Sequence, residues 1–597
     1  MSDDIFKGLN KQQIEAVSYI DGPSIILAGA GSGKTRVLIH KVINLTTHHK
    51  VDPREILMIT FTNKAAGEMK RRIALTQKKS LGYVGTFHSF CALILRKDGI
   101  HVGLNRNFVI YDDDDQTSLM KTILKEKEIK KFTPSFILNR ISATKNQLIT
   151  PDRYLKLFSD YSATQVFELY TEYEKRLKKN SAVDFDDLIM KVTQLFIKYP
   201  SILKKYQEQY QYIFVDEFQD TNYAQYTLTR LLGEAHHNVT AVGDFSQSIY
   251  SWRGADIRNL EKFESDFPGC KTFHLEQNYR SSQKILDFAY KVIAENEGHP
   301  ILKLFTENHS GEDIPIYEAR DEEDEAFYVS SEIERLKDSC PYEKIAVLYR
   351  TNAQSRAIEE SFLHYSIPYL LIGGTRFYER REVKDVLSYL RLLINPLDEL
   401  ARERILKIGK RKWDLFKSAY DELKTNVEEK PTLSLMESVF EKTGYLDQYS
   451  ADDEEDYARL ENIKELKSVA SNFSHITEFL QQVALVESEY SEGEKKRKAH
   501  EGVRLMTLHQ AKGLEFAIVF IVGVEEGILP HSRATEDYFQ MEEERRLFYV
   551  GITRAQDKLH ISYAKRRFLY GRRGEGVKSR FLGEDGSILK SSDEPEI

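Results

Sequence analysis

A glycine-rich turn followed by a Lys-Thr pair stands early in the chain, within residues 24–35. The run Ser-Ile-Ile-Leu-Ala-Gly-Ala-Gly-Ser-Gly-Lys-Thr opens with apolar residues that predict a buried strand, and the residues after Thr35 show helical spacing. Strand, glycine-rich turn and helix in this order are the setting of a phosphate-binding loop, whose backbone N–H groups surround a polyphosphate. Lys34 is predicted to reach the β- and γ-phosphates, and the Thr35 hydroxyl to ligate Mg²⁺. The predicted nucleotide contacts in this stretch are Ala28, Gly29, Ala30, Gly31, Ser32, Gly33, Lys34, Thr35 and Arg36.

Two adjacent carboxylates follow another apolar run, at residues 212–217. In an enzyme with a phosphate-binding loop, Asp216 is expected to hold Mg²⁺ and Glu217 to activate the attacking water. A third apolar run, ending near residue 243, leads to Gln247, whose amide could sense the γ-phosphate. The combination predicts hydrolysis of a nucleoside triphosphate.

Aromatic and basic side chains come directly after this sensor, as Tyr250, Trp252 and Arg253. Aromatic rings interleaved with a cation suit stacking on nucleic-acid bases together with contact to phosphate. The alternative is that these rings are ordinary core residues. The local sequence leaves both interpretations open.

Strand-like and helical segments alternate in two blocks, and these are the elements that must position the residues above. In the first half, strand-like segments at 25–27, 55–62, 83–87, 212–215, 239–242 and 272–275 are separated by helices, with an almost wholly helical stretch from about 112 to 206. The second half repeats the plan with strands at 314–317, 345–349, 369–372, 503–508, 517–522 and 559–563 and a helical, charged stretch from about 381 to 499. The pattern predicts two α/β cores, each interrupted by a helical insertion.

The composition is typical of a globular protein with several domains, because 597 residues are too many for one core. Hydrophobic residues make up 41% and charged residues 30%, and no apolar run approaches the length of a membrane span. Three scattered cysteines exclude a disulfide framework and a four-cysteine metal site, which favours a cytoplasmic protein. The net charge of −8 does not exclude nucleic acid, since binding depends on local basic patches such as 565–573.

Nine stretches in register carry a resemblance to a known family: residues 9–17, 28–35, 60–66, 85–90, 215–220, 275–281, 349–356, 507–516 and 549–555. The chain resembles a superfamily 1A DNA helicase of the UvrD/PcrA/Rep family, from residue 9 to about 582. This resemblance implies an α/β fold with two RecA-like P-loop NTPase cores, each with a mainly helical insertion. It places the first core at 1–88 and 200–276, its insert at 89–199, the second core at 277–380 and 500–583, its insert at 381–499, and a flexible tail at 584–597.

The resemblance also assigns roles to residues at matching positions. For the nucleotide, Gln13 is expected to read adenine, Tyr279 to stack on it, Glu515 to contact the ribose, and Arg280 and Arg554 to contact the γ-phosphate. Single-stranded DNA is expected to meet Phe61, Thr62, Thr86, His88, Phe185, Tyr250, Trp252, Arg253, Asn352, His509 and Tyr570, the last in a strand-separating hairpin.

The activity implied by the resemblance is a DNA helicase with DNA-stimulated ATP hydrolysis that moves 3′→5′ and unwinds duplex DNA, in repair, replication restart or recombination control. ATP and Mg²⁺ are the implied cofactors. Single-stranded DNA and its junctions with duplex are the implied partners, beside repair or replication proteins, and no membrane. The isolated protein is expected to be a monomer, cytoplasmic and, in a prokaryote, associated with the nucleoid.

Four departures from the family pattern affect these expectations. Phe245, Ser246 and Ser251 replace acidic and glycine residues before and after Gln247, and Gln510 replaces a small residue beside His509. The second insert looks short, with its duplex-binding turn reduced to residues 407–410, and the long C-terminal tail of some members is missing. A translocase that displaces bound proteins with little unwinding is therefore one alternative, and a non-catalytic DNA-binding scaffold is another.

Overall fold

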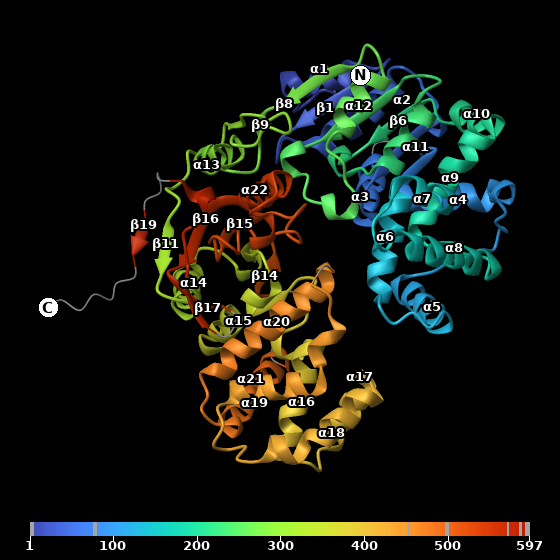
Figure 1. Ribbon diagram of the computed structural model, residues 1–597. Coiled ribbons are helices and arrows are strands. Elements are labelled where there is room, and N and C mark those ends of the chain that lie inside the picture. The colour runs from blue at the N-terminus through green and yellow to red at the C-terminus, as the bar shows by residue number, and fades with distance from the viewer. Residues whose placement is uncertain are drawn as a thin grey trace. The chain divides into compact units, whose positions relative to one another are not determined.

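Apolar strands separated by helices build two parallel sheets, as the sequence pattern predicts (Figure 1). The computed structural model of the chain describes residues 5–75, 80–451, 453–495, 501–569, 572–583 and 588–590. The contacts divide the chain into unit 1, Met1–Arg280 with Asn296–Asn308, and unit 2, Ser281–Glu295 with His309–Ile597. The predicted α/β fold class is confirmed, whereas the predicted domain limits stay predictions because these two units do not separate cores from inserts.

The sheet of unit 1 has six parallel strands in the order β3-β2-β6-β7-β1-β8. Their bounds are β1 (Ser24–Ala28), β2 (Ile56–Thr60), β3 (Tyr83–Thr86), β6 (Tyr212–Val215), β7 (Val239–Gly243) and β8 (Lys271–Leu275). The glycine-rich turn follows β1, Asp216 follows β6 and Asp244 follows β7, and β6, β7 and β1 are neighbours in the sheet. Because the strands are parallel, these chemically active groups meet at one edge.

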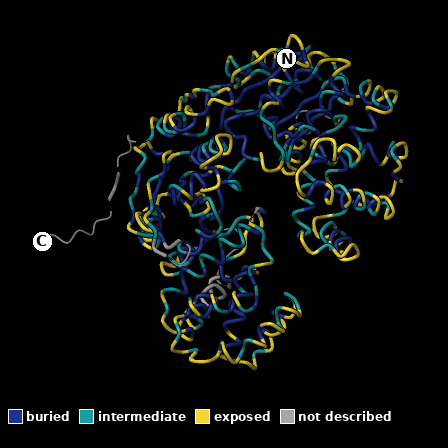
Figure 2. The backbone as a smooth tube through the Cα atoms, viewed as in Figure 1, coloured by how far each residue is buried: buried dark blue, intermediate teal, exposed yellow. Residues whose placement is uncertain are grey.

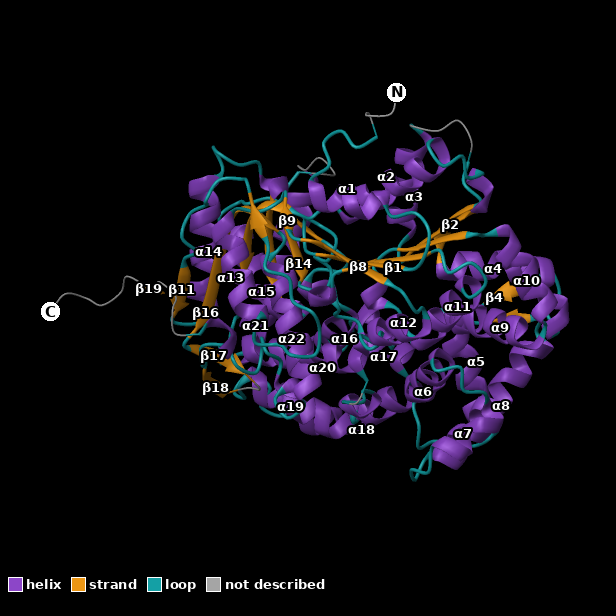
Figure 3. Cartoon of the chain, turned by 90° about the horizontal axis from the view of Figure 1, so that it is seen from above, coloured by secondary structure: helices purple, strands orange, loops and turns teal. Residues whose placement is uncertain are grey.

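Both faces of this sheet are covered by helices, which explains why its strands are almost uniformly apolar. Ile25 and Leu27 pack with residues of α4 (Phe87–Asp98), α9 (Phe185–Lys198) and α11 (Tyr223–Gly233). Ile26 and Ala28 pack on the other face, with α1 (Lys11–Ser18), α2 (Lys34–Thr47) and α3 (Asn63–Ala74). Figure 2 shows buried backbone inside unit 1, and in Figure 3 the strands β1, β2 and β8 lie between α1, α2 and α3 on one side and α4, α9 and α11 on the other. The period-two alternation of side chains thus holds the sheet in the middle of unit 1.

The helical stretch predicted in the first half is present between β3 and β6. In addition to α4 and α9, it contains α5 (Asp113–Glu126), α6 (Pro134–Asn146), α7 (Pro151–Leu157), α8 (Ala163–Lys179), α10 (Pro200–Gln209) and the short paired strands β4 (Val109–Ile110) and β5 (Ala182–Val183). A separate apolar cluster joins α5, α6 and α8 through residues such as Met120, Ile141 and Tyr170. This insert therefore has a core of its own. Unit 1 is completed by α12 (Asn259–Asp266) and the two-residue strands β9 (Gln277–Asn278) and β10 (Phe305–Thr306).

Lys41, on α2, is buried beneath the sheet without an anionic partner among the described carboxylates. Its ammonium lies 3.4 Å from the Ser24 hydroxyl oxygen and 5.5 Å from the centroid of the Tyr19 ring. Burial lowers the pKa of Lys41 from 10.5 to about 7. A charge in this position opposes folding, because the ammonium loses its hydration without an ion pair to replace it.

Replacing Lys41 by methionine is expected to raise the thermal denaturation midpoint at pH 7. Between about pH 7 and 10.5 the unfolded chain binds the proton that the folded chain releases, so wild-type stability should rise with pH, by up to about 1.4 kcal/mol per pH unit. The Lys41→Met variant should lack this part of the pH dependence, whereas Lys70→Met, at an exposed position of α3, should keep it. Identical pH profiles for wild type and Lys41→Met would contradict the assignment.

The sheet of unit 2 has seven parallel strands in the order β13-β14-β12-β15-β16-β11-β19. They are β11 (Ile316–Ala319), β12 (Ile345–Tyr349), β13 (Tyr369–Leu371), β14 (Val503–Thr507), β15 (Phe516–Ile521), β16 (Ala555–Ala564) and β19 (Ile588–Lys590). The helices beside them are α13 (Gln283–Ile293), α14 (Glu322–Leu336), α15 (Ser355–His364) and α22 (Tyr538–Ile552). The pairing of β19 with β11 means that the predicted tail after residue 583 is not wholly free of the sheet.

The second helical stretch lies between β13 and β14 in the sequence. It comprises α16 (Arg381–Ile394), α17 (Glu399–Ile408), α18 (Lys410–Lys424), α19 (Thr432–Thr443), α20 (Glu454–Ser471) and α21 (Ile476–Lys495). One apolar cluster runs from β12 through Tyr389 of α16 to Leu435 of α19 and Leu466 of α20. This insert shares one continuous core with its sheet, whereas in the first insert α5, α6 and α8 have a cluster separate from the core that α4 and α9 share with the sheet.

A hairpin of β17 (Arg566–Leu569) and β18 (Arg572–Glu575) projects after β16. Its base is held by Arg567, whose buried guanidinium donates to Glu525, at 2.8 Å from Oε1, and to Glu325. Tyr570, predicted to contact DNA from this hairpin, lies outside the described residues. Its role stays a prediction.

Candidate functional site

The glycine-rich turn adopts a backbone that only glycine accepts easily. Gly31 and Gly33 have φ angles of 65° and 87°, in the left-handed region. A Cβ atom on Gly31 would lie 2.7 Å from Asn278 Nδ2 and 2.8 Å from Arg280 Cβ. Ala28, the first residue of the predicted loop pattern, ends β1 and is fully buried, so a small side chain is sufficient there.

Lys34 and Thr35 open α2 immediately after this turn. The Lys34 ammonium lies 3.5 Å from the carbonyl oxygen of Ala28, so the side chain bends back over the turn. The first N–H groups of α2 have no partners within the helix, and with Lys34 they provide a positively polarised surface for phosphates. This arrangement matches the predicted phosphate-binding loop.

Three buried oxygen atoms at this edge of the sheet have no hydrogen-bond partner among the described residues. They are Ser32 Oγ, Thr60 Oγ1 and Asp216 Oδ1. Leaving a buried polar atom unpaired costs about 1–3 kcal/mol, so such atoms gathered at one sheet edge indicate a place built for a polar ligand. The carboxylate and hydroxyl oxygens of Asp216 and Thr35 are donors of the kind that Mg²⁺ prefers.

Asp216 and Glu217 follow β6 with different environments. Burial raises the pKa of Asp216 to about 7, with a further increase from the neighbouring Glu217 carboxylate, and Lys34 opposes both. Glu217 has a φ angle of 52°, which is uncommon for a residue with a side chain. Backbone strain of this kind costs about 1–3 kcal/mol and is concentrated at functional positions.

Gln219 connects Glu217 with the predicted sensor and was not assigned a role from the sequence. Its Nε2 donates to Glu217 Oε2 at 2.6 Å, and its Oε1 accepts from the backbone N–H of Asp244 at 3.1 Å. Asp244 Oδ2 in turn accepts from Gln247 Nε2 at 2.6 Å. A hydrogen-bonded path, which we call the Glu217–Gln247 path, therefore joins the ends of β6 and β7. In the sequence, the signal that could have identified Gln219 is its place in the stretch 215–220, which carries the family resemblance.

The residues predicted for the base of the nucleotide surround the start of α1. Tyr279 is 44% exposed, and its hydroxyl accepts from Asn10 Nδ2 at 2.9 Å and donates to Gln277 Oε1 at 3.1 Å. Gln13 is fully buried, with its Nε2 donating to the Ser32 carbonyl at 2.9 Å and its Oε1 accepting from the Asn10 N–H at 3.1 Å. In this structure Gln13 supports the turn, and its contact with a base stays a prediction.

Residues 278–280 pack directly on the glycine-rich turn. Asn278 Nδ2 donates to the Ala30 carbonyl at 2.7 Å, and the Tyr279 N–H donates to the Gly31 carbonyl at 3.0 Å. Arg280 is thereby placed beside the turn and within unit 1, although the sequence assigned it to the second core. Asn278, which the sequence analysis did not assign, is thus a structural partner of the loop.

Arg554 and Glu515 belong to unit 2 and lie near each other. The Arg554 guanidinium is buried and donates to the carbonyls of Val550 and Leu514, at 2.9 and 3.1 Å, and to Thr553 Oγ1 at 3.1 Å. Glu515, the next residue after Leu514, is exposed. The roles predicted for Arg554 and Glu515 in nucleotide binding stay predictions.

An aromatic surface in unit 1 contains the rings predicted to stack on DNA bases. Trp252 and Phe185 are 49% and 46% exposed, which removes the core interpretation for Trp252. Arg253 lies over the Trp252 ring at 4.5 Å, and Tyr250 meets the same ring edge-on at 6.4 Å. Phe185 contacts the ring of His88 at 5.9 Å. We call the exposed rings of Phe185 and Trp252 the stacking pair.

The other DNA contacts predicted in unit 1 follow β2 and β3. Thr62 and Thr86 cap the helices α3 and α4, because their hydroxyl oxygens accept from the N–H groups of Ala65 and Ser89. Phe61 is partly buried against Phe87, with the ring centroids 6.2 Å apart. The two threonines therefore have a structural role as helix caps, which does not depend on DNA contact.

In unit 2, the predicted DNA contacts Asn352 and His509 are both partly buried. Gln510, the departure noted beside His509, closes the turn after β14 by accepting from the Thr507 N–H at 3.0 Å. Its Nε2 also donates to the Gly373 carbonyl at 3.0 Å. The larger side chain thus connects two loops of unit 2, and its amide is engaged within the protein.

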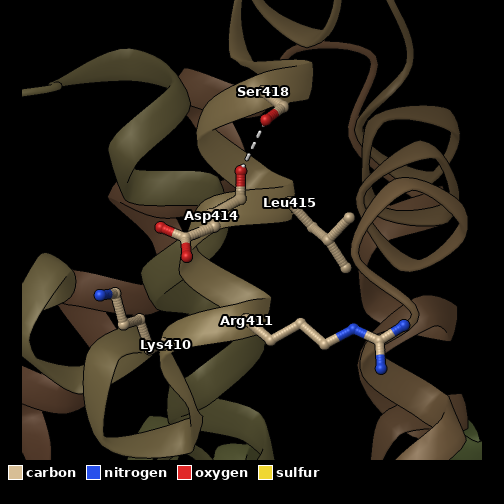
Figure 4. Close-up of a pocket in the computed structure, with 5 residues that line it drawn as sticks. All are labelled: Lys410, Arg411, Asp414, Leu415 and Ser418. Carbon is tan, nitrogen blue, oxygen red and sulfur yellow. Dashed lines mark hydrogen bonds between the residues drawn. The ribbon is translucent and has the colours of Figure 1, made fainter.

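The turn predicted to contact duplex DNA joins α17 and α18 at Gly409. Lys410 and Arg411 begin α18 and extend to opposite sides of it, beside an open hollow of about 520 Å³ that Asp414, Leu415 and Ser418 complete (Figure 4). Ser418 Oγ donates to the Asp414 carbonyl oxygen at 2.9 Å. The cations suit phosphate contact, and the duplex contact itself stays a prediction.

Helices of the described residues include none that is both long and apolar enough to span a bilayer.

Comparisons with known proteins agree with this geometry. Residues 9–268 match the family model described as the UvrD/REP helicase N-terminal domain, and residues 273–451 and 410–566 match that of the UvrD-like helicase C-terminal domain. The ATP-dependent DNA helicase PcrA of Bacillus subtilis (strain 168) is 42% identical, over 98% of this chain and 86% of the relative. The PcrA proteins of Staphylococcus epidermidis and Staphylococcus aureus are also 42% identical, over 97% and 96% of this chain and 86% of each relative.

Proposed function

Because the chain belongs to the UvrD/REP helicase family, we propose that it couples ATP hydrolysis to 3′→5′ movement on single-stranded DNA and to unwinding of duplex DNA. Relatives that are 42% identical bear the name ATP-dependent DNA helicase, which supports this activity. DNA repair and replication are the processes that suit such an enzyme.

The Glu217–Gln247 path is the observation that carries the proposal. It starts at the residue proposed to act on water and reaches the segment that continues into Tyr250 and Trp252. The Ser248 hydroxyl, which donates to the Gln219 carbonyl at 3.1 Å, strengthens this connection. A change at the phosphate end of the path can therefore alter the position of an aromatic DNA contact.

In the proposed reaction, Lys34 and the N–H groups of the turn neutralise the phosphates of ATP. Glu217 orients the attacking water and accepts its proton. Arg280 contacts the γ-phosphate, and Arg554 does the same after exchanging its present carbonyl partners. Mg²⁺, when held by Thr35 and Asp216, supplies positive charge beside the phosphates.

The proposed DNA track consists of aromatic rings rather than groups that read base edges. Stacking is worth about 1–3 kcal/mol per base and tolerates every base, so movement does not depend on sequence. The stacking pair, with Tyr250 and Phe61, supplies the rings of unit 1. Arg253, against Trp252, adds a cation for the phosphate backbone.

Strand displacement on three duplexes of equal length, with a 3′ tail, a 5′ tail or no tail, tests the proposed function. With ATP, only the 3′-tailed duplex should be unwound. Unwinding of the 5′-tailed duplex would overturn the direction. ATP hydrolysis stimulated by single strands without unwinding would favour the protein-displacing translocase, and the absence of any DNA-stimulated hydrolysis would favour a binding scaffold.

A further inference from the structure

The C-terminal end of α6 contacts both segments that carry the stacking pair. Its last two residues, Lys145 and Asn146, are consecutive and bond to different elements of unit 1. Lys145 bonds to the start of α9, which carries Phe185. Asn146 bonds to the start of α11, beside the turn that carries Trp252.

Lys145 is the centre of a buried charge cluster. Its ammonium lies 2.6 Å from Glu174 Oε1, 2.7 Å from Asp184 Oδ2 and 3.0 Å from Asp187 Oδ1. These three carboxylates are close enough together to bind a metal ion, but the ammonium of Lys145 already lies among them. Lys145 and both aspartates are almost completely buried, so separating them would leave unpaired charges away from water.

This cluster determines where Phe185 stands. Asp184 caps α9, accepting from the Asp187 N–H at 2.8 Å, while Asp187 Oδ2 accepts from the Asp184 N–H at 3.3 Å. Phe185 is the first residue of the helix and lies between the two aspartates that Lys145 binds. The exposed ring is therefore attached to a buried, charge-paired base.

Asn146 connects the end of α6 to the start of α11 through Asn222. The orientation of the Asn222 side chain is determined by its role as the cap of α11. Asn222 caps α11 with Oδ1, which accepts from the Gln225 N–H at 2.9 Å. Its Nδ2 is consequently directed outward and donates to Asn146 Oδ1 at 2.7 Å. Since the cap fixes which end of the Asn222 amide is the donor, Asn146 serves as the acceptor.

The turn that contains Trp252 packs on the same two residues, Asn146 and Asn222. Asn222 forms an isolated antiparallel bridge with Ala255, whose N–H donates to the Tyr250 carbonyl at 3.1 Å. A Cβ atom built on Gly254, whose φ angle is 83°, would lie at van der Waals distance, 3.7 Å, from the Cβ atoms of both Asn146 and Asn222. The turn around Trp252 thus rests against the end of α6.

We propose that Lys145 and Asn146 are positioning residues that hold Phe185 and Trp252 at the separation required for simultaneous stacking on one DNA strand. We call these two residues the α6 brace. This proposal rests on the function proposed above, because the spacing of the stacking pair matters only if both rings stack on DNA bases. Neither residue contacts a base itself.

The test uses Asn146, because removing Lys145 would leave buried carboxylates without compensation and could unfold the insert. Asn146→Leu should raise the KM for single-stranded DNA in the ATPase assay about fivefold, the size expected from loss of one hydrogen bond. The kcat at saturating DNA should change by less than about twofold. Asn146→Asp, which keeps the acceptor, should restore the wild-type KM, and Gln147→Leu, at the exposed next residue, should not alter it.

A double-mutant cycle gives a readout that a merely structural role would not change. In the wild-type background, the effects of Phe185→Leu and Trp252→Leu on the KM should be non-additive, whereas in Asn146→Leu they should be additive. An unchanged KM in Asn146→Leu, or coupling that survives in it, would overturn the α6 brace. Absence of DNA-stimulated hydrolysis in the wild type would instead overturn the proposed function, and the brace with it.

Discussion

Replacing Lys34 by alanine is expected to reduce the rate of ATP hydrolysis by at least about a hundredfold, with or without DNA. The ammonium, 3.5 Å from the Ala28 carbonyl oxygen, is the full positive charge beside the turn that is proposed to bind the phosphates. Backbone N–H groups supply only partial charges, so they cannot replace it when negative charge moves between phosphate oxygens. Steady-state phosphate release, measured with saturating single-stranded DNA, checks this expectation.

Lys70→Ala, at an exposed position of α3, is the matched control and should hydrolyse ATP at the wild-type rate. The thermal denaturation midpoint of Lys34→Ala should also remain close to wild type, because the Lys34 side chain is only partly buried. Retained hydrolysis by a folded Lys34→Ala protein would refute the assignment of the turn as the phosphate site.

Replacing Glu217 by glutamine is expected to lower the hydrolysis rate by about 10²–10⁴-fold while ATP binding remains. The amide has the shape of the carboxylate but cannot accept a proton from water. Gln219, which donates to Glu217 Oε2 at 2.6 Å, can still donate to the amide oxygen of the variant. Single-turnover hydrolysis, together with filter retention of labelled ATP, separates the two effects.

Glu208→Gln, at an exposed position of α10, serves as the control for a change from carboxylate to amide and should behave as wild type. If Glu217→Gln hydrolyses ATP as fast as this control, Glu217 is not the base. If it loses ATP binding instead, the residue supports the nucleotide rather than the water.

Most of the strands could be predicted because both faces of each sheet are covered, which makes the strands apolar runs. The runs at 212–215 and 345–349 coincide with β6 and β12. The strand predicted at 314–317 is β11, which starts at Ile316 because Pro315 has no N–H for the ladder. The strand predicted at 559–563 is longer, because β16 begins at Ala555 and pairs with β15 through Ala555 and Lys558, with an irregularity in the register between them.

The positions of site residues could be predicted where one side chain stands in a recognisable pattern, and not where a residue acts through a set of contacts. Lys34 and Asp216 stand in short, regular patterns, so their positions followed from the sequence. Gln219 acts through Asp244, which follows β7, and Lys145 acts through Asp184, 39 residues further along the chain at the start of α9. No spacing rule expresses such contacts, because they depend on how distant elements pack.

The support that Asn278 and Arg280 give to the glycine-rich turn has a consequence for the order in which the protein is made. Asn278 is 248 residues beyond Ala30, the residue whose carbonyl it binds. On the ribosome, β1 and α2 are therefore complete long before the residues that occupy the space beside Gly31 have been synthesised. The nascent chain can begin to form its sheet early, but the glycine-rich turn is completed by its packing partners only when nearly half of the protein has emerged.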